Sequence, residues 1–305
     1  MEARLLPQRS KSLLTLLVGL AGCTGPNPAY VTGRADAGTD HGAGLDQATA
    51  DQTTADQTGA DQFAGDQMSA DQPPTAPDLR TGLVGYWQMN DPVGSLAATD
   101  SVGGPPQRAV LEDLDEDTVW VPMGKFESAL EMAPTSRAGG LRVDGTTAID
   151  GLFHYTLAAW IWRTGLQSPT SYQFIISRQV GDTDYEVFGL LVHQDRLRAF
   201  APHSEPFTAA DVVAPTALPT GTWVHVAVTY DGRTLTLYQD AAVVDTVVHP
   251  LTALAPTGKP LYIGTNKNAQ AGRAEPFVGL LDEVLLYSVA LGPTQIQALS
   301  QGRRP

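Results

Sequence analysis

Residues 223–230 alternate with a period of two, and this pattern constrains the fold more than any other feature of the chain. One set of alternate positions is apolar or aromatic: Val224, Val226, Val228 and Tyr230. Alternate side chains of a strand point to opposite faces, so the segment is predicted to be a half-buried β-strand. The pair Asp231-Gly232 predicts a type I′ hairpin turn into a second strand over 234–238.

Runs of the same character recur through residues 81–305. They occupy 83–89, 155–162, 173–177, 185–193, 242–248, 261–264 and 277–289, whereas only 293–300 has a helical pattern. Turn residues separate these runs about every ten residues, and strands do not alternate with helices. We therefore expect an all-β fold for residues 81–305, an antiparallel sandwich of two sheets.

The segment 24–80 has a different composition. The pair Asp-Gln recurs at intervals of five residues, starting at Asp46, Asp51, Asp56, Asp61, Asp66 and Asp71. A period of five matches neither a helix nor a strand face, and the segment has too few large apolar residues to form a core. Single aspartates five residues apart also do not converge on one calcium ion. We therefore expect residues 23–80 to form a disordered, self-repelling linker.

The N-terminus has the anatomy of an export signal. Basic residues precede an apolar run over 13–21, which is shorter than the roughly 20 residues that span a bilayer. The run ends in Leu20-Ala21-Gly22-Cys23, which resembles the lipobox of bacterial lipoproteins, and Cys23 is the single cysteine of the chain. The resemblance implies a signal peptide over 1–22 and lipidation of Cys23. The alternative is an ordinary secretory signal with a chance cysteine. A lone cysteine excludes a disulfide scaffold.

Several motifs along 81–305 resemble laminin G-like domains. The opening Gly85-Tyr86-Trp87 is followed in order by 100–103, 124–130, 155–161, 223–232 and 279–287. Together they resemble the concanavalin A-like lectin/glucanase superfamily, which implies a jelly-roll of two curved antiparallel sheets. The chain departs from the family pattern at Asp240-Ala241, where Asp-Gly is usual. The loops 164–175 and 201–221 are longer than a minimal version needs, and function is commonly grafted on such loops.

Catalysis is not expected. Glycosidases of this superfamily carry alternating carboxylates on one strand, whereas the acidic run Glu112–Asp117 does not have that order and lies in a predicted loop. The same run lacks the glycine and the closing glutamate of a calcium loop. No nucleophile elbow, zinc motif or phosphate loop occurs. His225 is interpreted as a structural residue of a central strand.

Two binding features remain. Trp160 and Trp162 share one strand face, opposite Leu157, Ala159 and Ile161. Trp160 matches a family position and is interpreted as packing. An exposed Trp162 could stack on a sugar ring, and the alternative is its coverage by a neighbouring loop.

The resemblance also implies a structural calcium ion near the chain ends, because members of the superfamily often hold one there. The candidate oxygen ligands are Asp91, Asp100 and Asp282. The alternative is that these are hydrogen-bonded loop aspartates.

The sequence thus predicts a bacterial envelope lipoprotein, held on the outer membrane more readily than on the inner one because Thr24 follows Cys23. The expected role is non-catalytic binding of a polysaccharide or glycoprotein. The alternative is a protein–protein adhesion or scaffold module, and a polysaccharide-active enzyme is the least favoured. A net charge of −14 argues against a nucleic-acid partner.

Overall fold

The computed structural model describes residues 76–102, 107–116, 119–132, 139–165, 171–180, 185–200, 210–250, 258–268 and 273–305. The predicted signal peptide, the predicted lipidation site at Cys23 and the Asp-Gln repeats lie outside these residues. All described residues belong to one compact unit, Ser69–Pro305. Within the described part, no helix is long and apolar enough to cross a membrane.

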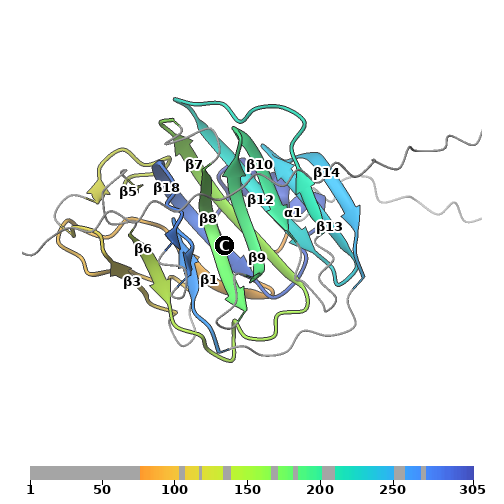
Figure 1. The fold of residues 1–305 in the computed structure, drawn as a ribbon, viewed down its shortest axis with the longest axis horizontal. Helices are drawn as coiled ribbons and strands as arrows, with labels where there is room; N and C mark the ends of the chain where they lie inside the picture. The colour runs from red at the N-terminus through yellow and green to blue at the C-terminus, as the bar shows by residue number, and fades with distance from the viewer. Residues whose placement is uncertain are drawn as a thin grey trace, which may run out of the picture. The chain divides into compact units, whose positions relative to one another are not determined.

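Two antiparallel eight-stranded sheets pack against each other, which confirms the all-β sandwich (Figure 1). Sheet A has the order β14-β13-β12-β7-β18-β5-β4, and β1 also pairs with β18. Its strands are β1 (Leu83–Trp87), β4 (Trp120–Val121), β5 (Ala129–Met132), β7 (Tyr155–Arg163), β12 (Trp223–Tyr230), β13 (Thr234–Gln239), β14 (Ala242–Val248) and β18 (Gly279–Tyr287).

Sheet B has the order β11-β10-β9-β8-β15-β6-β3-β2. Its strands are β2 (Ala97–Ala98), β3 (Ala109–Glu112), β6 (Gly140–Val143), β8 (Tyr172–Val180), β9 (Tyr185–His193), β10 (Arg196–Phe200), β11 (Asp211–Val213) and β15 (Leu261–Ile263). A small hairpin joins β16 (Lys267–Asn268) to β17 (Arg273–Ala274), and α1 (Pro293–Ser300) is the one helix of the described residues. Every strand run and the helix predicted from the sequence are present.

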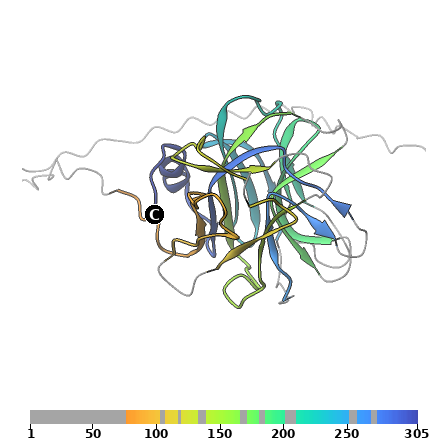
Figure 2. The same ribbon diagram turned by 90° about the vertical axis from the view of Figure 1, so that its left-hand side faces the viewer.

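The main core lies between the two sheets, whose strands Figure 2 shows from the side. The alternate residues Val224, Val226, Val228 and Tyr230 of β12 all belong to it. A second buried cluster lies on the outer face of sheet A, where α1 covers Ala158, Tyr287 and their neighbours. This cluster includes Leu79, so residues 76–80, placed in the linker from their composition, pack on the domain instead.

The prediction of a type I′ turn at Asp231-Gly232 is wrong. Type I′ needs positive φ at both central residues, and here only Gly232 has it, at +84°. Three residues separate β12 from β13, and the Asp231 carboxylate accepts hydrogen bonds from the backbone N–H groups of Arg233 and Thr234. This side chain therefore stabilises a longer turn than the dipeptide alone would suggest.

The next hairpin has the conformation that was expected of the first. Asp240 and Ala241 form a two-residue loop between β13 and β14, with φ of 47° and 67°. Alanine is strained in this left-handed region, where glycine is not. We predict that Ala241→Gly stabilises the protein by about 0.5–1 kcal/mol. Urea unfolding measures this, with Ala242→Gly in β14 as the control that should destabilise. A stability loss in Ala241→Gly would contradict the strain.

Candidate functional site

Trp162 and Trp223 lie side by side on the outer face of sheet A. They are direct cross-strand partners in β7 and β12, with ring centroids 6.0 Å apart in an edge-to-face arrangement. Their neighbours Ile161 and Val224 point into the core, so both indoles point away from it. Both are half-buried, which leaves part of each ring open to solvent. We call them the tryptophan pair.

A buried arginine fixes the loops beside the tryptophan pair. Arg163, the last residue of β7, donates to the Asp195 carboxylate at 2.7 Å and to the Leu218 carbonyl at 2.8 Å. Leu218 in turn donates to the Asp195 carbonyl, and Gly221 donates to the Arg163 carbonyl. The β9–β10 turn, the segment 214–222 and the end of β7 are therefore held together. Leu218 and Gly221 belong to the long loop 201–221 singled out in the sequence; residues 166–170 and 201–209 lie outside the described residues.

Trp160 lies two residues before Trp162 on the same face of β7 and is only 7% exposed. Its ring contacts Phe126 and His225 edge-on, and the Lys125 ammonium lies 4.1 Å from its centroid. The face of Trp160 is therefore already covered, so this indole cannot itself be the open stacking platform.

His225 lies between Trp160 on β7 and the β13–β14 turn. The side chain is buried, and burial lowers its pKa to about 3. Neither ring nitrogen has a hydrogen-bond partner among the described residues. The imidazole is therefore neutral and closed off from solvent at neutral pH, as a structural residue would be.

The three predicted calcium ligands do not form one cluster. Asp100 accepts hydrogen bonds from the backbone N–H groups of Tyr86, Val102 and Gln107. Asp91 accepts from Thr99, and both aspartates line a cavity of about 350 Å³.

Asp282 does not line that cavity; it is buried on β18 and accepts from the Phe126 N–H, and burial raises its pKa to about 7. Among the described residues, no group of three or more His, Cys, Asp or Glu side chains could hold a metal. Calcium binding stays a prediction.

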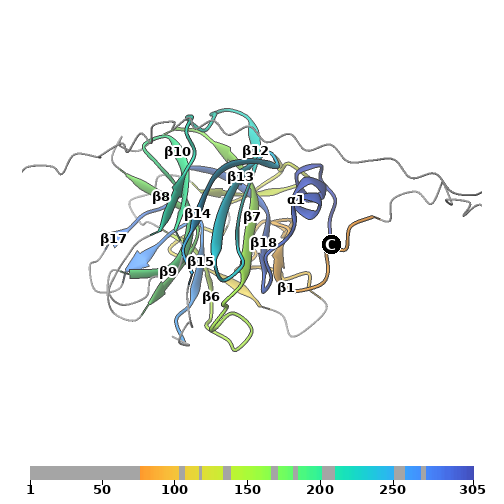
Figure 3. The same cartoon turned by 90° about the vertical axis from the view of Figure 1, so that its right-hand side faces the viewer.

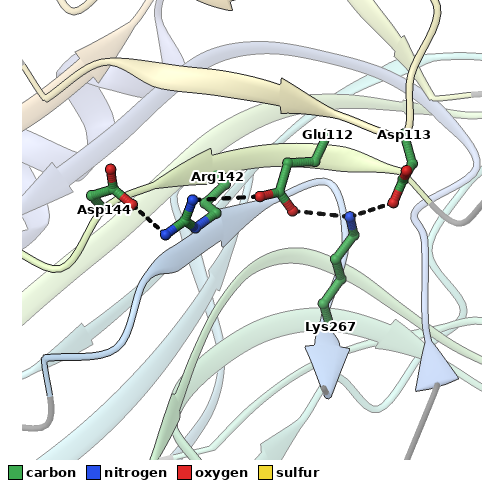
Figure 4. Close-up of polar contacts among 5 residues, drawn as sticks. All are labelled: Glu112, Asp113, Arg142, Asp144 and Lys267. Carbon is green, nitrogen blue, oxygen red and sulfur yellow. Dashed lines mark hydrogen bonds and ion pairs between the residues drawn. The ribbon is translucent and has the colours of Figure 1, made fainter.

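Two carboxylates of the acidic run, Glu112 and Asp113, form ion pairs with cationic side chains, as Figure 4 shows. The Lys267 ammonium lies 3.0 Å from Glu112 and 2.8 Å from Asp113. Arg142 lies 3.6 Å from the other Glu112 oxygen and 2.5 Å from Asp144. Cations therefore balance the charges of Glu112 and Asp113. Asp117 lies outside the described residues.

The match to a family model decides the identity of the fold. The model of the concanavalin A-like lectin/glucanases superfamily, Laminin_G_3, matches residues 139–297, which is more than half of the chain. The chain belongs to this family. The laminin G-like match includes both strands of the tryptophan pair and the whole of β18. No curated protein sequence matches the chain.

Solved structures show the same fold at low sequence identity. The binding domain of Paraclostridial Mosquitocidal Protein 1 is similar with a TM-score of 0.55 and 15% identity, over 74% of this chain and 53% of that one. The binding domain of Botulinum Neurotoxin DC in complex with SialylT has a TM-score of 0.53 and 12% identity, over 73% and 52%. The binding domain of the same neurotoxin in complex with rat synaptotagmin II has a TM-score of 0.52 and 13% identity, over 74% and 52%. The laminin G-like chain thus spans about half the length of these proteins.

Trp223 and Lys267 are the residues that sequence reasoning missed. The register that places Trp223 beside Trp162 joins two strands far apart in the chain, and only the predicted alternation of both strands could have suggested it. Lys267 reaches the acidic run from the β16–β17 hairpin, for which the sequence contains no strand signal.

Proposed function

We propose that this laminin G-like domain is a non-catalytic carbohydrate-binding module. The observation that carries the proposal is the tryptophan pair, two partly open indoles on a rigid sheet beside fixed loops. Indole faces stack on the C–H faces of sugar rings, and a site on strands needs little ordering when the ligand binds. The paired charges of Glu112 and Asp113 support a role without catalysis.

The cellular setting is part of the same proposal. Cys23 carries the lipid anchor, the Asp-Gln linker extends from it, and the domain is displayed at the bacterial cell envelope, on the outer membrane in preference to the inner one. Several acyl chains hold a protein on a membrane stably. Metabolic labelling with palmitate tests the anchor: the wild-type chain should be labelled and Cys23→Ser should not. Equal labelling of both chains would contradict it.

Protein binding is the second candidate function. Val243 and Val248 of β14, an edge strand of sheet A, are 55% and 61% exposed. Exposed apolar residues on an edge strand favour association with another protein. One of the similar structures is also a complex with a protein, rat synaptotagmin II.

A glycan microarray separates these functions. The full chain carrying Cys23→Ser is applied in calcium and again in chelator. We expect specific signal on the array. Loss of that signal in chelator would show that glycan binding depends on calcium. An unchanged signal would show that calcium is not needed for binding. If no glycan on the array binds, protein binding at the β14 edge becomes the favoured function.

A further inference from the structure

A cavity of about 480 Å³ lies between the two ends of the described domain, and neither member of the tryptophan pair lines it. One wall is the root segment, which we define as residues 76–80, and the other is the C-terminal tail, residues 303–305. Figures 2 and 3 both show the C-terminus beside the orange start of the domain. Three arginines line the cavity: Arg80, Arg303 and Arg304.

Both walls of this cavity are fixed by hydrogen bonds. The tail follows α1 through a Schellman cap, in which Gly302 has a φ of +81° and donates to the Leu299 carbonyl. The Arg303 N–H donates to the Ala298 carbonyl at 3.0 Å. These bonds satisfy the last carbonyls of the helix and set the direction in which Arg303 and Arg304 leave it.

The root segment has its own turn. The Asp78 carboxylate accepts hydrogen bonds from the Arg80 N–H and from the Thr81 hydroxyl. Two bonds then tie this turn to the domain: Gln295 Nε2 donates to the Asp78 carbonyl at 2.6 Å, and the Tyr287 hydroxyl donates to the Leu79 carbonyl at 3.0 Å. The backbone that carries the three arginines is therefore preorganised.

The charges in the cavity are unbalanced. Asp78 is the one acidic side chain among the lining residues, and its oxygens accept hydrogen bonds within the turn. Arg304 is held by Glu283 at 2.8 Å and lies over the Phe126 ring. The hydrogen bond from Thr81 lowers the pKa of the Asp78 carboxyl, and the charge of Arg80 contributes to that lowering; among the described residues Arg303 forms no ion pair. Three guanidinium groups thus line the cavity against one carboxylate side chain, in a protein whose net charge is −14.

We propose that this cavity binds the phosphate group of an organic phosphate. Guanidinium groups bind phosphate oxygens through paired N–H donors, and two of them from opposite walls can hold one group between them. A cavity of this volume has room for a phosphate together with the organic group that carries it. The phosphate can come from a lipid headgroup or from a soluble phosphate ester. This proposal does not rest on carbohydrate binding.

The test uses the full chain carrying Cys23→Ser and two probes. The first probe is inorganic phosphate, compared with chloride at equal ionic strength by thermal unfolding. The second is vesicle co-sedimentation, with phosphatidylcholine alone and with added phosphatidylglycerol. The test variant is Arg80→Gln with Arg303→Gln. The matched control is Arg108→Gln with Arg196→Gln, which removes the same charge from two exposed arginines, one just before β3 and one at the start of β10.

We expect phosphate to raise the melting temperature of the wild type and of the control, and to have no effect on the test variant. If the source is a lipid, the test variant should also bind phosphatidylglycerol vesicles about thirtyfold more weakly, since each basic residue near an anionic surface adds about fivefold. Phosphate binding without vesicle binding supports a soluble ester.

The proposal is overturned if phosphate has no effect on the wild type, or if the control pair loses binding as strongly as the test pair. Vesicle binding without a phosphate effect would indicate general surface attraction and would overturn it as well. Urea unfolding of each variant shows that the comparison is made on folded protein. None of these substitutions touches the tryptophan pair, so glycan binding should be unchanged in all of them.

Discussion

Gly279→Ala should lower the free energy of unfolding by about 3 kcal/mol or more. Gly279 is the first residue of β18 and has a φ of +145°, which side chains rarely adopt. A Cβ there would lie 1.9 Å from the backbone carbonyl oxygen of Trp162. The backbone cannot move aside as the end of a side chain can, so β7, the strand that carries Trp162, must shift.

Two other glycines at this end of the sandwich provide matched controls. A Cβ at Gly165 or at Gly221 would meet no atom within 4 Å, and only Gly221 has a positive φ, of +69°. Gly165→Ala should therefore be neutral, and Gly221→Ala should cost about 1 kcal/mol through backbone strain alone. Thermal and urea unfolding of the three variants measure the order of their stabilities. A Gly279→Ala protein as stable as Gly165→Ala would contradict the close approach of β18 to β7.

Acid should destabilise this protein through His225. Burial lowers the pKa of this side chain to about 3 in the folded protein, whereas an unfolded histidine has a pKa near 6.5. Below pH 6.5 the unfolded chain therefore binds a proton that the folded chain excludes. The stability that neutral His225 contributes is fully present above pH 6.5 and falls by about 1.4 kcal/mol per pH unit toward pH 3. At pH 4.5 the loss expected from His225 alone is about 2–3 kcal/mol, and protonation of Asp282, whose pKa burial raises to about 7, acts in the opposite direction.

His225→Leu should remove most of this loss. Leucine is similar in size and cannot be protonated, and the imidazole nitrogens have no hydrogen-bond partners among the described residues to lose. Urea unfolding at pH 7 and pH 4.5 gives the difference for each variant. His154→Leu, at an exposed histidine, is the control and should behave as the wild type. An equal acid loss in the wild type and in His225→Leu would show that other groups cause it.

The strands of this domain were predictable because burial on one face imposes a period of two. The alternation over Val224–Tyr230 predicted β12, and the core contains the residues on the apolar positions. The helix over 293–300 was predicted from its own helical pattern. The family motifs added the jelly-roll, which periodicity alone does not specify.

The turns and the cross-sheet pairings were not predictable in the same way. Asp231 forms a side-chain turn where a tight dipeptide turn was expected, and Asp240-Ala241 adopts positive φ without glycine. Both depend on how far each strand continues and on its register, which side-chain patterns fix only to within a residue or two. Trp223 and Lys267 reach their partners through the tertiary fold, so no local pattern indicates them.

The most direct test of the account is the affinity of Trp162→Ala and Trp223→Ala for the strongest glycan on the array. Both rings lie on the outer face of sheet A and are partly open, so each variant should fold and lose about tenfold or more in affinity. Tyr172→Ala, at a partly exposed aromatic residue of sheet B, is the matched control and should bind as the wild type does. Unchanged affinity in both tryptophan variants would contradict the tryptophan pair as the binding platform.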